Sequence, residues 1–227
     1  MNVSTHEQPG AMREFVLIAA LFAGLGYWLA TRMLEPSLGL IAWKGAGVGL
    51  LTVWAAMHAR GVDGWLIALV MACGATGDVL LDAIGLTVGA AAFLVGHLVA
   101  IVLYWRNRRP ELSPSQKLLV MVLAPLVVGI AWLLPADRSA APAIALYSLA
   151  LAAMAAVAWS SRFPRYWTGL GAILFVTSDL LIFARLGPLA SSALPGLLIW
   201  PLYFTGQAMI VMGVVRTLQA SGDKTPI

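Results

Sequence analysis

Charged residues are scarce in this chain of 227 residues. Only 11% are Asp, Glu, Lys or Arg, whereas 61% are hydrophobic and the mean hydropathy is +0.89. A soluble globular domain is about one-quarter charged, and so few charges cannot cover the surface of a soluble protein of this size. The composition therefore excludes a soluble domain and indicates an integral membrane protein.

Cysteine and histidine are also rare. The single cysteine, Cys73, excludes a disulfide framework, and of the three histidines only His97 lies deep in an apolar run. A zinc hydrolase needs several His or Cys ligands, so we expect no metal and no cofactor. The chain also has no G-x-S-x-G motif, which argues against a serine hydrolase. We attribute the net charge of +4 to loop lysines and arginines that set the membrane orientation, and we expect no nucleic-acid partner.

Long apolar runs of about 18–22 residues fill the chain, and this is the length that a helix needs to cross a hydrocarbon core of ~30 Å. They lack the alternating pattern of barrel strands, and proline or glycine separates most of them. We predict an all-α polytopic membrane protein with one domain, residues 1–227, and eight transmembrane helices. Their expected bounds are 15–33, 38–59, 64–84, 86–106, 117–134, 140–159, 167–187 and 196–217. The third and fourth should form a tight hairpin around Gly85.

The basic residues of the loops predict the orientation. Eight spans place both termini on one side, and that side carries Arg13, Arg60, Arg106, Arg108, Arg109, Lys117, Arg162, Arg165, Arg216 and Lys224. The other side carries only Arg32, Arg138 and Arg185. Because cytoplasmic loops are rich in Lys and Arg, we expect both termini to be cytoplasmic, in the inner membrane of a bacterium.

Two pairs of short segments hint at an internal repeat. Gly77-Asp78-Val-Leu-Leu resembles Ser178-Asp179-Leu-Leu-Ile, and Phe93-Leu-Val-Gly-His97 resembles Tyr203-Phe-Thr-Gly-Gln207. Each pair is four spans apart, as in a 4+4 arrangement of two parallel halves. Chance similarity between helices rich in small and aliphatic residues is the alternative.

Several polar side chains lie within the predicted spans. Ionisable groups at membrane depth cost a few kcal/mol each, so each one is a candidate for function. The set consists of Lys44, Asp78, Asp82, His97, Asp179, Tyr203 and Gln207. All except Asp82 lie between the middle of the bilayer and its outer third, because Lys44 and Asp78 are six residues from the outer end of their spans and His97 and Gln207 are eleven. We therefore predict one site.

The alternatives for individual residues stay open at this stage. Asp82 lies one turn nearer the surface than Asp78 and would line the mouth of the site. Lys44 could pair with an aspartate, while His97 and Tyr203 could be ordinary core residues. Arg185 could extend to the membrane surface or meet a lipid phosphate.

Two aspartates on different helices, with a lysine and a histidine nearby, suit general acid–base chemistry. Burial disfavours the ionised form of a carboxyl group, and a nearby cation favours it. Different surroundings can therefore make one carboxyl group an acid and the other a base. The same residue types also form proton relays in transporters, so a proton-coupled carrier of a small or lipid-like substrate is the second hypothesis.

The order of these motifs resembles one family. G-D-x-x-L-D at 77–82, F-x-x-G-H at 93–97, S-D-L-L at 178–181 and Y-x-x-x-Q at 203–207, with a lysine early in the second span, are similar to the YhhN-type lysoplasmalogenases. The resemblance extends over all eight spans. It implies hydrolysis of the vinyl ether bond of lysoplasmalogens, which gives a fatty aldehyde and glycerophosphoethanolamine or glycerophosphocholine.

On this interpretation Asp78 and Asp179 form the catalytic pair, and which of them is the acid is left open. Lys44, Asp82, His97, Ser178, Tyr203 and Gln207 would support or bind the substrate. His97, Gln207 and Tyr203 would orient water and the glycerol hydroxyl, and Lys44 would pair with a carboxylate or bind the phosphate. The expected partners are lysoplasmalogen and membrane lipids, with the oligomeric state left open. A hydrolase of another lysolipid is a further alternative.

Overall fold

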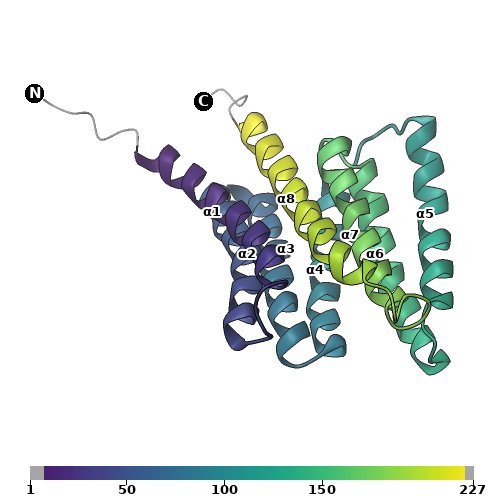
Figure 1. Cartoon of the computed structure of the whole chain (residues 1–227). Helices are drawn as coiled ribbons and strands as arrows, with labels where there is room; N and C mark the ends of the chain where they lie inside the picture. The colour runs from purple at the N-terminus through teal and green to yellow at the C-terminus, as the bar shows by residue number, and fades with distance from the viewer. Residues whose placement is uncertain (1–7, 223–227) are drawn as a thin grey trace, which may run out of the picture.

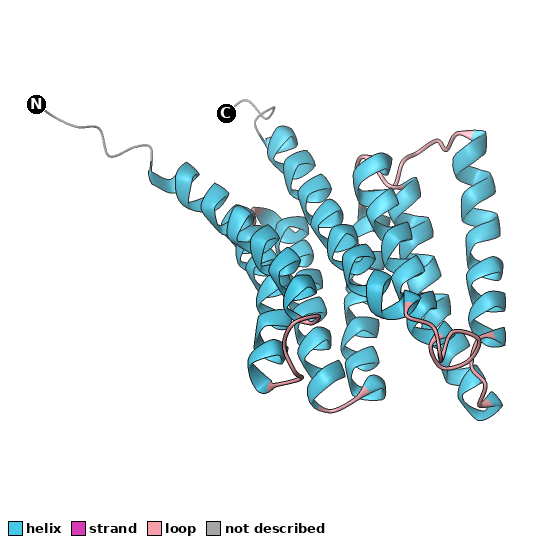
Figure 2. Ribbon diagram, in the orientation of Figure 1, coloured by secondary structure: helices cyan, strands magenta, loops and turns pink. Residues whose placement is uncertain are grey.

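The computed structural model describes residues 8–222, and Lys224 of the predicted cytoplasmic set lies outside them. Within this range the chain is entirely helical apart from loops (Figure 2). The long helices are α1 (Gln8–Ala30), α2 (Leu38–His58), α3 (Gly61–Ala83), α4 (Leu86–Arg106), α5 (Pro114–Leu133), α6 (Ala141–Ser160), α7 (Leu170–Ala184) and α8 (Leu194–Gly222). A 3₁₀ turn, η2 (Arg138–Ala140), precedes α6, and a π turn, η3 (Arg165–Gly169), precedes α7.

All eight long segments are apolar enough to cross a membrane. Large apolar side chains also point outward from the bundle, among them Phe22, Met121 and Leu133, which are 71%, 75% and 74% exposed. Such an outer surface suits a hydrocarbon solvent and would be unfavourable in water. The chain is an all-α integral membrane protein, as its composition predicts.

Local sequence signals explain where several helices begin and end. Ser37 caps α2 by accepting the backbone N–H of Leu40, and Ser113 forms a capping box with Gln116 at the start of α5. The hairpin between α3 and α4 turns at Gly85, whose φ of +133° is disfavoured for residues with a side chain. The largest differences from the predicted bounds are at α1, which begins at Gln8 and ends at Ala30, and at α8, which extends to Gly222.

The helices form two groups with α8 between them (Figure 1). Helices α1 to α4 pack in chain order, α5 to α7 lie on the other side, and α8 contacts α1, α2, α3 and α7. The start of α1 and the end of α8 lie at the same end of the bundle. We call the opposite end, which holds the α3–α4 turn, the Gly85 end.

Small residues let α7 and α8 approach closely. A Cβ atom on Gly171 would lie 2.7 Å from the carbonyl oxygen of Gly206, and one on Gly206 would lie 2.6 Å from that of Gly171. Close backbone contact of this kind is common between membrane helices. It fixes Asp179 on α7 relative to Tyr203 on α8. The contacts of α3 with α4 and of α7 with α8 occupy equivalent places in the two halves, and the 4+4 repeat stays a prediction.

Candidate active site

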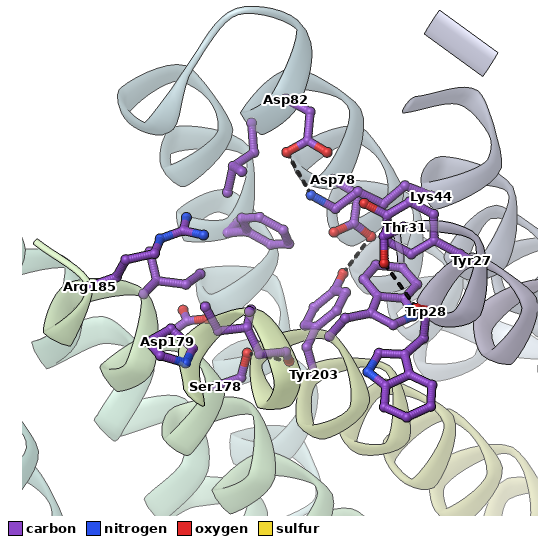
Figure 3. A pocket seen from close by; sticks show the side chains of 17 residues that line it. Tyr27, Trp28, Thr31, Lys44, Asp78, Asp82, Ser178, Asp179, Arg185 and Tyr203 are labelled. Carbon is purple, nitrogen blue, oxygen red and sulfur yellow. Dashed lines mark hydrogen bonds and ion pairs between the residues drawn. The ribbon is translucent and has the colours of Figure 1, made fainter. Parts of the chain in front are cut away.

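A cavity of about 210 Å³ lies near the Gly85 end, among α1, α2, α3, α4, α7 and α8 (Figure 3). Most of the residues that the sequence singles out line it: Lys44, Asp78, Asp82, Ser178, Asp179 and Tyr203. His97 and Gln207 do not line the cavity. Segments a hundred residues apart in the chain therefore meet at one site.

Asp78 lies on α3 and is only 3% exposed. The hydroxyl of Tyr203, on α8, donates a hydrogen bond to its Oδ2 over 2.9 Å. Gln207, one turn further along α8, donates from Nε2 to the same tyrosine oxygen over 3.2 Å. Gly74 makes room for this contact, because a Cβ atom there would lie 2.7 Å from Nε2 of Gln207.

Asp179 lies on α7 and is 5% exposed. The hydroxyl of Tyr147, on α6, donates to its Oδ2 over 2.7 Å. Nε2 of His97, on α4, is 3.0 Å from the same tyrosine oxygen. A tyrosine hydroxyl has one hydrogen, so when Tyr147 donates it to Asp179, Nε2 of His97 must be the donor in its own bond.

The two aspartates therefore have matching surroundings. One oxygen of each accepts a tyrosine hydroxyl, and the tyrosine in turn accepts a hydrogen from a residue behind it. Among the described residues the other oxygen of Asp78 and of Asp179 has no hydrogen-bond partner. Figure 3 shows Asp78 and Asp179 on opposite sides of the cavity. Two fixed carboxyl groups that border one cavity can exchange protons with a molecule held between them.

Lys44 pairs with Asp82, and not with Asp78 or Asp179. Its Nζ is 2.9 Å from Oδ1 of Asp82, at the mouth of the cavity (Figure 3). Pairing with a carboxylate is one of the two roles that the sequence left open for this lysine, and its role in the reaction stays a prediction. The ion pair joins α2 to the last turn of α3, where the side chains of Lys44 and Asp82 are 11% and 30% exposed.

Ser178 has a structural contact. Its hydroxyl donates to the carbonyl oxygen of Ile199 over 3.0 Å and so ties α7 to α8 next to Asp179. His97 contacts Tyr147, and Gln207 contacts Tyr203. Both residues are buried, at 2% and 1% exposed, and neither lines the cavity. The expectation that they orient water and the glycerol hydroxyl stays a prediction.

Aromatic rings enclose the buried end of the site. The ring of Phe175 lies 5.0 Å from that of Tyr203 and 5.1 Å from that of His97, and Phe93 lies 5.7 Å from Tyr203. These edge-to-face contacts hold the hydrogen-bonded tyrosine in a water-poor environment. Ordered surroundings of this kind preorganise carboxyl groups for chemistry.

Several lining residues were not assigned a place in the site from the sequence, and three of them are Tyr27, Trp28 and Arg185. Tyr27 and Trp28 come from α1, and Arg185 follows the end of α7. Arg185 is exposed at the mouth, and within residues 8–222 its side chain forms no ion pair. Tyr147, which holds Asp179 but does not line the cavity, was also missed.

No group of three or more His, Cys, Asp or Glu side chains among the described residues is arranged to hold a metal ion. The cavity lining supplies carboxyl, hydroxyl and basic side chains.

The amino-acid sequence is similar to those of known proteins. The chain is 31% identical over 192 residues to proteins named lysoplasmalogenase from Mycobacterium bovis and Mycobacterium tuberculosis, which covers 80% of this chain and 70% of each relative. No solved structure matches the chain significantly. The model of the YhhN family matches residues 39–214, a range that contains both aspartates and the residues that hold them. The chain belongs to the YhhN family.

Proposed function

We propose that this protein is a lysoplasmalogenase, which hydrolyses the vinyl ether bond of lysoplasmalogens to a fatty aldehyde and glycerophosphoethanolamine or glycerophosphocholine. The family and the name of the two relatives support this activity. The observation that carries the proposal is the pair of buried carboxyl groups, Asp78 and Asp179, on one cavity within the membrane.

The reaction needs an acid and a base. A protonated carboxyl group gives its proton to the β-carbon of the vinyl ether. The electrons of the double bond form the new C–H bond, and the carbon bonded to oxygen becomes an oxocarbenium ion. The second, ionised carboxyl group stabilises this cation and accepts a proton from the attacking water, as carboxylate pairs do with glycosides. The hemiacetal then collapses to aldehyde and glycerol hydroxyl. Asp78 and Asp179 fill these two roles, in an order that the proposal leaves open.

The remaining residues hold the pair and the substrate. Tyr203 and Tyr147 fix the orientation of the two carboxyl groups, and Gln207 and His97 fix the tyrosines. Lys44 and Asp82 form the rim of the cavity. Since Lys44 is neutralised by Asp82, Arg185 is the cation that would contact the substrate phosphate at the mouth.

The location of the protein is part of the proposal. The distribution of basic residues favours cytoplasmic termini and a bacterial inner membrane, with residues 1–227 as one domain. The Gly85 end, with the mouth of the cavity, would then face the outer side. A lysolipid in the outer leaflet could place its glycerol near the two aspartates while its phosphate stays at the membrane surface.

Product analysis tests the function. The purified protein is incubated with lysoplasmenylethanolamine and, separately, with the acyl lysophospholipid of the same headgroup, and both aldehyde and fatty acid are measured. The proposal predicts aldehyde from the first substrate and no fatty acid from the second. Fatty acid without aldehyde would indicate a different lysolipid hydrolase. Uptake into proteoliposomes that follows a pH gradient, without aldehyde, would indicate a carrier.

A reaction in D₂O tests the first chemical step. Protonation of the β-carbon predicts one deuterium on the carbon next to the aldehyde carbonyl. An aldehyde incubated in D₂O without enzyme controls for exchange after the reaction. Aldehyde without this deuterium would contradict the proposed proton transfer.

A further inference from the structure

An apolar groove of about 470 Å³ lies between α1 and α8. Its walls include Leu21 and Leu25 of α1 and Phe204, Thr205 and Met212 of α8. Leu21 and Leu25 are 39% and 56% exposed, so the groove is open to the surrounding lipid. The lining is almost entirely apolar, and Thr205 supplies its one hydroxyl group. It suits a hydrocarbon chain and not a headgroup.

The groove adjoins the carboxylate cavity. Trp28 and Trp200 line both of them. Their indole groups also fasten the two helices together, since Trp200 donates to the carbonyl oxygen of Gly24 over 2.7 Å and Trp28 donates to that of Leu197 over 3.0 Å. The Leu197 carbonyl is available because Pro201, four residues later, has no N–H to donate to it. The boundary between the cavity and the groove is thus held in place.

The direction and length of the groove fit one lipid chain. From Trp200 to Met212 the groove follows α8 for twelve residues, or ~18 Å at ~1.5 Å per residue. One leaflet of a ~30 Å hydrocarbon core is about as thick. The groove leads away from the Gly85 end, whereas another hollow, which shares Tyr27, Thr31 and Asp82 with the cavity, leads toward that end between α1 and α2.

A lysoplasmalogen has its vinyl ether between the glycerol and the alkenyl chain. When the vinyl ether occupies the cavity and the phosphate lies at its mouth, the chain must leave in the opposite direction. We propose that the alkenyl chain of the substrate passes the edges of Trp28 and Trp200 and lies in the groove between α1 and α8. The inference rests on the proposed function and adds the binding site for the hydrocarbon part of the substrate. The groove then sets the chain length that the enzyme prefers.

Narrowing the groove tests the inference. Leu25→Trp and Thr205→Trp add bulk from opposite walls at exposed positions, and Leu149→Trp adds the same bulk on α6 at a leucine that is 49% exposed and does not border the groove. The measured quantity is the ratio of kcat/KM for an 18-carbon lysoplasmalogen to that for a 10-carbon one. We expect the two groove variants to lower this ratio roughly tenfold, because each contact with a methylene group contributes to recognition. We expect Leu149→Trp to keep the ratio of the unaltered protein.

The outcomes separate the inference from the function on which it rests. If the unaltered protein releases aldehyde and all variants have the same kcat/KM ratio, the alkenyl chain does not lie in the groove, and the proposed activity still stands. Equal losses for both chain lengths would also overturn it. Absence of aldehyde from the unaltered protein with every chain length would instead overturn the proposed function.

Crosslinking gives a second test that does not depend on turnover. An ether analogue of the lysolipid, with a diazirine at the end of its chain, should label peptides around Leu21 of α1 or Met212 of α8. Excess lysoplasmalogen should suppress this labelling, and a diacyl phospholipid should not. Labelling of α5 or α6 would contradict the inference, and so would equal suppression by the diacyl lipid, which would identify the groove as a site for bulk lipid chains.

Discussion

Tyr147 donates its hydroxyl hydrogen to Asp179 over 2.7 Å, from α6 to α7, and Tyr203 makes the equivalent bond to Asp78 from α8 to α3. Each aspartate therefore has one oxygen fixed by a neighbouring helix and one that has no partner among the described residues. A carboxyl group held in this way has little freedom to rotate, which favours a productive geometry with a bound substrate. The two tyrosines act as positioning residues.

Replacement of either tyrosine by phenylalanine tests this role. Tyr147→Phe and Tyr203→Phe each keep the ring and remove the bond to the carboxyl group. We expect aldehyde release to fall on the order of 10- to 100-fold, because the carboxyl group loses its fixed orientation. Steady-state kinetics and melting temperature in detergent are the measurements.

Tyr104→Phe is the matched control. Tyr104 is fully buried, and among the described residues its hydroxyl has no hydrogen-bond partner. Removal of an unsatisfied buried hydroxyl should leave activity unchanged and the melting temperature unchanged or higher. Equal activity losses in all three variants would contradict the positioning role, because the effect would then come from loss of any buried hydroxyl.

Two glycines of neighbouring helices give a second matched comparison. In Gly74→Ala the new methyl group would lie 2.7 Å from Nε2 of Gln207 and 3.2 Å from the Tyr203 oxygen, whereas around Gly49 no atom lies within 4 Å of an added Cβ. We expect Gly74→Ala to lower aldehyde release about tenfold, since it displaces the residues that hold Asp78. Gly49→Ala should keep the activity and favour the helix. Full activity of Gly74→Ala would show that the Gln207–Tyr203 contact is dispensable.

A substrate without a headgroup tests the proposed phosphate contact of Arg185. For Arg185→Gln we expect kcat/KM for lysoplasmalogen to fall about tenfold, a modest loss because the side chain is exposed. For 1-alkenylglycerol, which has no phosphate, the variant should lose much less, so the preference for the phospholipid shrinks. Arg185→Lys keeps the charge and should be intermediate. An equal loss with both substrates would assign Arg185 a structural role.

The sequence predicts the helices and the common depth of the polar residues well. It predicts the hydrogen-bond and ion-pair partners of those residues poorly. Hydrocarbon thickness determines the length of each apolar run, and the rise per residue places Asp78 and Asp179 at similar depths. The partner of Lys44 depends on how α2 is rotated about its axis, which sequence spacing does not reveal. Its contact with Asp82 therefore had to come from the structure.

Tyr147 was missed for a different reason. A tyrosine among the alanines and leucines of α6 is typical of packing, yet its hydroxyl needs a partner when it lies within a membrane. It lies six residues after Ala141, the first residue of α6, and Asp179 lies five residues before Ala184, the last residue of α7. Tyr147 and Asp179 therefore lie at similar depths, and a comparison of tyrosine depths with aspartate depths would have paired these two residues. One contact of α1 with α8 also had an unused signal, because Pro201 leaves the carbonyl of Leu197 without its helical donor and Trp28 donates to it.

In the proposed mechanism Asp78 and Asp179 together perform the acid and base steps of vinyl ether hydrolysis. The most direct test is aldehyde release from lysoplasmalogen by Asp78→Asn and Asp179→Asn, each shown to be folded by its melting temperature and elution profile in detergent. Asparagine keeps the size of the side chain and cannot donate or accept the catalytic proton. The account predicts that each single variant loses essentially all turnover, on the order of 100-fold or more. Near-normal aldehyde release by either folded variant would contradict it.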